Sequence, residues 1–146
     1  MGDARLNACG YTVPNKEEAA AVSLIAELME VILYVQDMNA QVSFYRDKLG
    51  LSVKYPQGLS DYSQEFWVEL DTGACILVLH GGGQKRLGPD SPKIVFRVAN
   101  IEAARSEVLN RDVQIGEVRS PAPSVWVCDG KDPEGNKFSI ESRDSD

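Results

Sequence analysis

The sequence predicts an α+β domain built from two βαβββ modules in tandem. An alternating apolar strand followed by a capped amphipathic helix occurs twice, at an offset of 63 residues, and similar turns containing Asp and Gly follow each occurrence. The chain has 146 residues, 43% of them apolar, which is enough for one domain with its own core.

Residues 1–27 differ in pattern from the rest of the chain and are predicted to be an appendage. They are polar and glycine-containing at first, and the stretch 14–21 is compatible with a short helix that Asn15 would cap. The domain itself is expected at 28–142, with its modules at 28–82 and 91–142.

The first module is predicted to begin with a strand at 30–35, where Val31, Leu33 and Val35 share one face. Asp37 is placed to cap the following helix, and Gly50 to end it in a left-handed conformation. The helix is predicted from apolar residues that recur at helical spacing, namely Met38, Val42, Tyr45 and Leu49.

Three further strands are expected in this module, at 51–55, 65–70 and 74–80. The last two flank Asp71-Thr72-Gly73, whose glycine can supply the positive φ of a tight hairpin. A stretch rich in Gly and Pro at 81–92 is predicted to link the modules.

The second module repeats these signals. The stretch 93–101 matches 30–38 in strand face, helix cap and first helical apolar residue, with Asn100 at the position of Asp37. Downstream, Asp132-Pro133-Glu134-Gly135 corresponds to the hairpin turn of the first module.

Two motifs resemble the vicinal oxygen chelate superfamily, which includes glyoxalases, bleomycin-resistance proteins and extradiol dioxygenases. They are Phe44-Tyr45-Arg46-Asp47-Lys48-Leu49-Gly50-Leu51 after a capped helix and Asp132-Pro133-Glu134-Gly135-Asn136 before the last strand, and the resemblance covers 28–141. It implies curved mixed sheets around a U-shaped small-molecule cleft. Enzymes of the superfamily generally hold a divalent metal there.

The resemblance places the metal-ligand positions on Glu30, Leu77, Lys93 and Ser139. One carboxylate, one aliphatic side chain, one ammonium and one hydroxyl do not make a divalent site. No cofactor is therefore predicted, and a divalent metal is the alternative. We expect Glu30 and Lys93 to form an ion pair in place of the metal, although both could instead be solvated at strand starts.

Side chains alternate along strands, so parity predicts which residues line the cleft. His80 would then point away from the cleft, and Trp67 and Trp126 are more typical of a core than of a ligand site. No catalytic residue is assigned. The predicted cleft-lining residues are Glu30, Ile32, Tyr34, Cys75, Leu77, Lys93, Arg97, Ser139 and Glu141.

Charge and composition exclude several partners. The net charge of −7, without a basic run, argues against nucleic acid, and no apolar stretch reaches the ~20 residues that cross a bilayer. Three cysteines without CxxC spacing suggest reduced thiols. We expect a cytoplasmic protein, and the resemblance suggests a homodimer.

The sequence therefore favours a protein that binds a small organic molecule, in the manner of bleomycin-resistance proteins and without the usual catalytic metal. The alternative is a metal-dependent glyoxalase-like lyase or isomerase, or a dioxygenase, with Glu30 as a ligand or general base. A third reading is a dimerisation or regulatory module.

Overall fold

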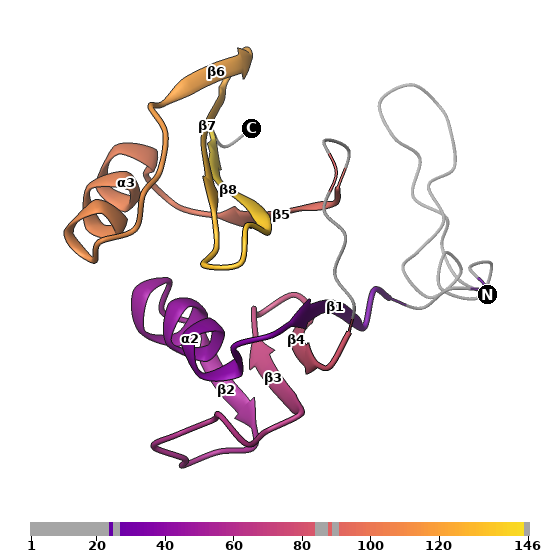
Figure 1. Ribbon diagram of the computed structural model, residues 1–146. Helices are drawn as coiled ribbons and strands as arrows, with labels where there is room; N and C mark the ends of the chain where they lie inside the picture. The colour runs from indigo at the N-terminus through magenta and orange to yellow at the C-terminus, as the bar shows by residue number, and fades with distance from the viewer. Residues whose placement is uncertain (1–23, 25–26, 84–87, 89–90, 145–146) are drawn as a thin grey trace.

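The computed structural model describes residues 24, 27–83, 88 and 91–144 (Figure 1). The helix predicted at 14–21, with its cap, lies outside these residues. Within the described ranges, no helix combines the length and the apolar character that crossing a membrane requires.

Module one contains one mixed four-stranded sheet, which we call sheet one. Its strand order is β1-β4-β3-β2, with β1 parallel to β4 and the other pairs antiparallel. The elements in chain order are β1 (Glu30–Val35), α2 (Met38–Ser43), the π-helical turn η1 (Phe44–Lys48), β2 (Ser52–Tyr55), β3 (Trp67–Asp71) and β4 (Ile76–Gly81).

Module two repeats this topology in a second sheet, sheet two, with the order β5-β8-β7-β6. Its elements are β5 (Lys93–Arg97), α3 (Ile101–Asn110), β6 (Arg119–Ala122), β7 (Val125–Lys131) and β8 (Lys137–Arg143). The predicted pair of βαβββ modules is confirmed, and neither sheet closes into a barrel.

The local signals read from the sequence act as predicted. The Asp37 side chain accepts a hydrogen bond from the Ala40 amide at 3.0 Å, and Asn100 accepts one from the Ala103 amide at 2.8 Å. Gly50 and Gly73 have φ values of +81° and +84°, a region that side chains with a Cβ rarely adopt. Both helices therefore start, and the first hairpin turns, where expected.

The two modules share one apolar core. Residues of both sheets and both helices belong to a single buried cluster, and the rings of Phe44 and Phe138 meet across the junction at 5.7 Å. Figure 1 shows α2 between sheet one and module two. Each sheet thus turns its buried face toward the other module and its second face outward.

Polar contacts also join the modules, through the turn between β7 and β8. Glu134 accepts hydrogen bonds from the Gln36 amide at 2.8 Å and the Asp37 amide at 3.2 Å, directly before α2. The Tyr45 hydroxyl donates to buried Asp132 at 2.8 Å. Burial and the nearby Asp132 raise the pKa of Tyr45, so its hydroxyl stays protonated as the donor.

Candidate functional site

The outward surfaces of the two sheets are the candidate functional regions. Strand pairing places side chains that share a face opposite one another, which defines both surfaces. Outer face one, on sheet one, consists of Glu30, Ile32, Tyr34, Trp67, Glu69, Asp71, Ile76, Val78 and His80. Outer face two, on sheet two, consists of Lys93, Val95, Arg97, Val127, Asp129, Lys131, Lys137, Ser139 and Glu141.

Outer face one carries an aromatic cluster around His80. The ring centroid of His80 lies 5.1 Å from that of Tyr34, 5.4 Å from that of Trp67 and 4.9 Å from that of Phe66, which directly precedes β3. Phe66 is 61% exposed and Tyr34 48% exposed. The cluster therefore presents ring surface to solvent, which is unusual for a side-chain set of this size.

Polar groups fix the orientation of this cluster. The Trp67 indole donates to Glu69 at 3.0 Å, two positions along β3 on the same face. His80 Nδ1 lies 2.6 Å from the carbonyl oxygen of Gly81, and an oxygen acceptor requires a protonated Nδ1. The surface therefore combines aromatic rings, the imidazole of His80 and carboxylates.

The predicted parity of β4 is wrong by one residue. Leu77 pairs with Val31 and is buried in the core, so it does not share a face with Glu30. The residue on that face is His80, which pairs with Tyr34 and was expected to point away. Cys75 precedes β4 in the hairpin turn, where it is half-buried. The cause is that β4 lies between β1 and β3 and is apolar on both faces, so its sequence does not alternate.

Trp67 also lies on the outer face rather than in the core. A signal for this was present in β3, where Glu69 and Asp71 alternate with the buried Val68 and Leu70. Trp67 shares the parity of the two acids. Trp126, by contrast, packs against the core as expected.

Outer face two is organised around Asp129. Its carboxylate accepts hydrogen bonds from Lys93 Nζ at 3.1 Å, Ser139 Oγ at 2.5 Å and Arg119 Nη2 at 2.6 Å. Burial raises the pKa of this carboxyl, but the hydrogen bonds from Ser139, Arg119 and Lys93 lower it by more. The resulting pKa is about 2. Asp129 is therefore fully ionised at neutral pH and holds two cations in place.

The predicted ion pair between Glu30 and Lys93 is wrong, because in the described part of the chain Lys93 pairs with Asp129 of its own module. Glu30, Ile32 and Tyr34 do share outer face one, as predicted. Lys93, Arg97, Ser139 and Glu141 share outer face two, again as predicted. Within one chain the structure does not bring the two sets together, because both faces point away from the shared core.

The donors present do not fit a divalent metal. Of the four positions that the family resemblance assigns, Leu77 is in the core, and the Lys93 and Ser139 head groups bond to Asp129. Among the described residues, no group of three or more His, Cys, Asp or Glu side chains converges as a metal site would require.

Comparison with known proteins places the fold. No family model and no curated protein matches the sequence. Similar solved structures include a putative glyoxalase family protein from Bacillus anthracis, with 14% identity, coverage of 84% of this chain and 98% of that one, and a TM-score of 0.66. The chain thus has the paired-module fold of the glyoxalase and vicinal oxygen chelate proteins.

Two other similar structures belong to proteins with different functions. One is lactoylglutathione lyase from Agrobacterium tumefaciens, at 18% identity, covering 82% of this chain and 96% of that one, with a TM-score of 0.61. The other is TnmS3, an antibiotic binding protein from Streptomyces sp. CB03234, at 17% identity, covering 84% and 99%, with a TM-score of 0.65. At such identities these likenesses show the fold, and the activity has to be argued from the side chains.

Proposed function

We propose that this chain is a small-molecule-binding protein whose ligand lies on outer face one and which works without the metal that enzymes of this fold use. The observation that carries the proposal is the exposed aromatic cluster of Tyr34, Phe66, Trp67 and His80. Apolar surfaces with a few oriented polar groups are typical of ligand sites. The donor set described above supports the absence of a metal.

The chemistry of this face favours a flat, cationic ligand. The ionisable residues of outer face one apart from His80 and Tyr34 are the three acids Glu30, Glu69 and Asp71. Aromatic faces attract cations through their quadrupoles, and nearby carboxylates add to that attraction. The structural likeness to an antibiotic binding protein agrees with this ligand class.

We further propose a homodimer in which outer face two of one copy covers outer face one of the other. The two faces are complementary in charge, because the first carries three acids along with its aromatic rings. The second carries four basic side chains, Lys93, Arg97, Lys131 and Lys137, against the two acids Asp129 and Glu141. The ligand would then lie between two chains. Light scattering with size exclusion tests this directly, and a monomer at all concentrations would contradict it.

Ligand binding is tested by titrating the full chain with bleomycin and with the planar cation proflavine, followed by tryptophan fluorescence. We expect saturable quenching that Phe66→Ala weakens by about tenfold, since stacking on one ring contributes roughly 1–2 kcal/mol. Leu109→Ala is the control, because Leu109 is similarly exposed but lies on α3. Equal weakening by both variants would show that the cluster is not the site.

A metal-dependent lyase or isomerase, or a dioxygenase, is the second candidate, favoured by the likeness to a lactoylglutathione lyase and by His80 facing outward. Elemental analysis before and after incubation with manganese, nickel, iron or zinc separates the two. We expect less than about 0.1 metal per chain, in line with the missing ligand set. One metal per chain, lost in His80→Asn, would replace the binding proposal with the enzyme.

A further inference from the structure

A cavity of about 530 Å³ lies between the modules. Most of its lining comes from the core side of the two sheets, and Ile76, Val95 and Arg97, which the strand register places on the outer faces, complete it. This volume is within the range of small-molecule sites. Its walls come from the ends of β1 and β5, the segment after η1, and α3, and include Val31, Leu49, Leu51, Ile94, Phe96 and Val98. The walls are therefore mostly apolar, with a few charged side chains among them.

The cavity exists because the two helices differ at equivalent positions. At the offset of 63 residues, Gln41 and Tyr45 of module one correspond to Ala104 and Val108 of module two. Gln41 and Tyr45 are fully buried and fill the space under their helix. Ala104 and Val108 are much smaller and line the cavity instead. Module two thus leaves open the space that module one fills.

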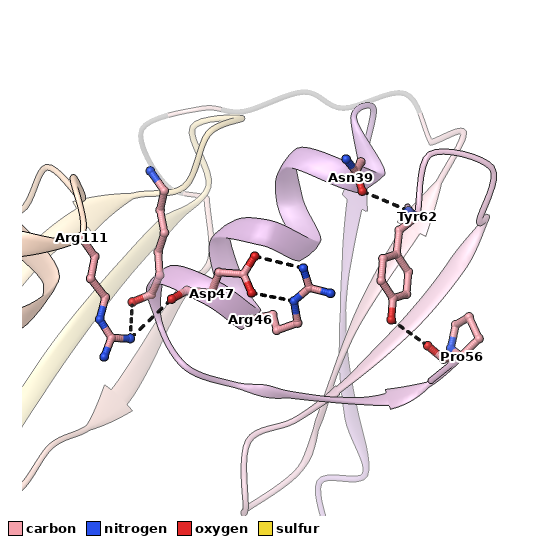
Figure 2. A network of polar contacts seen from close by, with 7 residues as sticks. Asn39, Arg46, Asp47, Pro56, Tyr62 and Arg111 are labelled. Atoms are coloured by element: carbon pink, nitrogen blue, oxygen red, sulfur yellow. Dashed lines mark hydrogen bonds and ion pairs between the residues drawn. The ribbon is translucent and has the colours of Figure 1, made fainter. Parts of the chain in front are cut away.

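The cavity is lined by three basic side chains, Lys48, Arg97 and Arg111, and by one acidic side chain, Glu107. Figure 2 shows Arg111 at the end of α3 reaching the main chain of module one, where it donates to the carbonyls of Asp47 at 3.4 Å and Lys48 at 3.3 Å. Arg111 also forms an ion pair with Glu107, with 2.8 Å between Nη2 and Oε1. Within the described residues, the side chains of Lys48 and Arg97 have no carboxylate partner, although both line the cavity.

We infer that this cavity binds a small amphiphile with an apolar body and a single carboxylate. The apolar body lies against the core faces of β1 and β5, and the carboxylate meets Lys48 and Arg97. An unpaired cation beside an apolar space favours an anion, because a charge-assisted hydrogen bond forms where water is partly excluded. The site shares no residue with the aromatic cluster, so this inference is independent of ligand binding on outer face one, and it shares only Arg97 with the basic residues of the proposed dimer face.

The test is calorimetric titration of the full chain with decanoate and with decanol. Decanoate is expected to bind one per chain, and Ala104→Phe, which fills the cavity, to abolish binding while the protein still unfolds cooperatively. If Ala104→Phe does not fold, Ala104→Leu serves the same purpose. The double variant Lys48→Gln with Arg97→Gln should weaken decanoate by about tenfold or more and leave decanol unchanged.

Lys131→Gln is the matched control, since it removes one exposed cation from another region. No decanoate binding to the full chain, or binding that Ala104→Phe leaves intact, would overturn the inference. So would binding that Phe66→Ala weakens, because the ligand would then lie on outer face one. If Ala104→Phe instead converts a dimer into a monomer, the cavity holds a second copy and the inference is wrong.

Discussion

The two modules share one topology but have opposite outer faces. On sheet one the aromatic rings around His80 are exposed, Glu69 accepts a hydrogen bond from Trp67, and Glu30 and Asp71 lie farther along the same face. On sheet two the central carboxylate, Asp129, is bonded to Lys93, Ser139 and Arg119. One backbone pattern therefore supports a surface of exposed aromatic rings and a surface whose central carboxylate is paired within its own module.

This difference shows that the fold constrains the two faces of each sheet unequally. The inward positions Phe138 and Ile140 must stay apolar, since they form the core on which both modules depend. The outward positions of the same strand are free to change chemistry without loss of the core. Function can thus diverge between the modules while the architecture stays the same.

The largest predicted effect concerns the turns that correspond in the two modules. Asp132→Ala should lower the free energy of unfolding by about 3 kcal/mol, because it leaves the Tyr45 hydroxyl and two amides without their acceptor in a buried site. Asp71→Ala, at the exposed turn of module one, removes one bond to Gly73 and should cost less than about 1 kcal/mol. Urea denaturation measures both, and equal losses would contradict the comparison.

A smaller effect, of the opposite sign, is expected at Gln41. Its side chain is fully buried, and neither amide atom has a hydrogen-bond partner among the described residues. Gln41→Met keeps the shape and should raise the free energy of unfolding by about 1 kcal/mol, since an unpaired buried amide is costly. Gln57→Met, at an exposed position, is the control. A loss of stability in Gln41→Met would show that the amide is satisfied.

Acid should weaken outer face two in particular. The pKa of Asp129 is about 2 in the folded chain, below its ordinary value of 3.8, so the ionised form stabilises the fold above pH 4. This contribution is lost as the pH falls from 4 to 2. Because the carboxylate is 43% exposed, we expect only about 1 kcal/mol. In Asp129→Asn the unfolding free energy should change less over this range, and identical pH profiles would contradict the assignment.

The last prediction concerns the chemical reactivity of the thiols rather than the stability of the fold. Burial raises the pKa of Cys128, and its side chain is inaccessible, whereas Cys75 is half-exposed. Iodoacetamide should label Cys75 at least roughly tenfold faster than Cys128 in the folded chain, because Cys128 must wait for local opening. Peptide mass mapping measures both rates, and similar rates would contradict the burial of Cys128.

The fold could be predicted from the sequence because its signals are local. Asp37 and Asn100 cap helices by bonds to residues three positions away, and Gly50 and Gly73 mark turns by backbone conformation alone. The parity of β1, β5 and β8 followed from alternation. In β4 no alternation exists, so only its pairing with β1 reveals which residues face outward.

The candidate site was harder to predict because it depends on contacts between strands. The partner of Lys93 is 36 residues away on β7, so nothing in the sequence near Lys93 indicates it. The repeat suggested Glu30 as the partner instead, because Glu30 and Lys93 occupy equivalent positions in the two modules. The aromatic cluster was missed for the same reason, because Tyr34 and His80 meet through strand register.

The contact of Glu134 with the start of α2 has a consequence for synthesis of the chain. The two partners, Gln36 and Glu134, are 98 positions apart. During synthesis α2 therefore leaves the ribosome long before Glu134, which accepts hydrogen bonds from the amides just before this helix, has been made. Module one therefore lacks this contact for about 5–20 s, because 98 residues are added at ordinary elongation rates of about 5–20 residues per second. During that interval its apolar helix face is open to chaperones, and translation past Glu134 ends it.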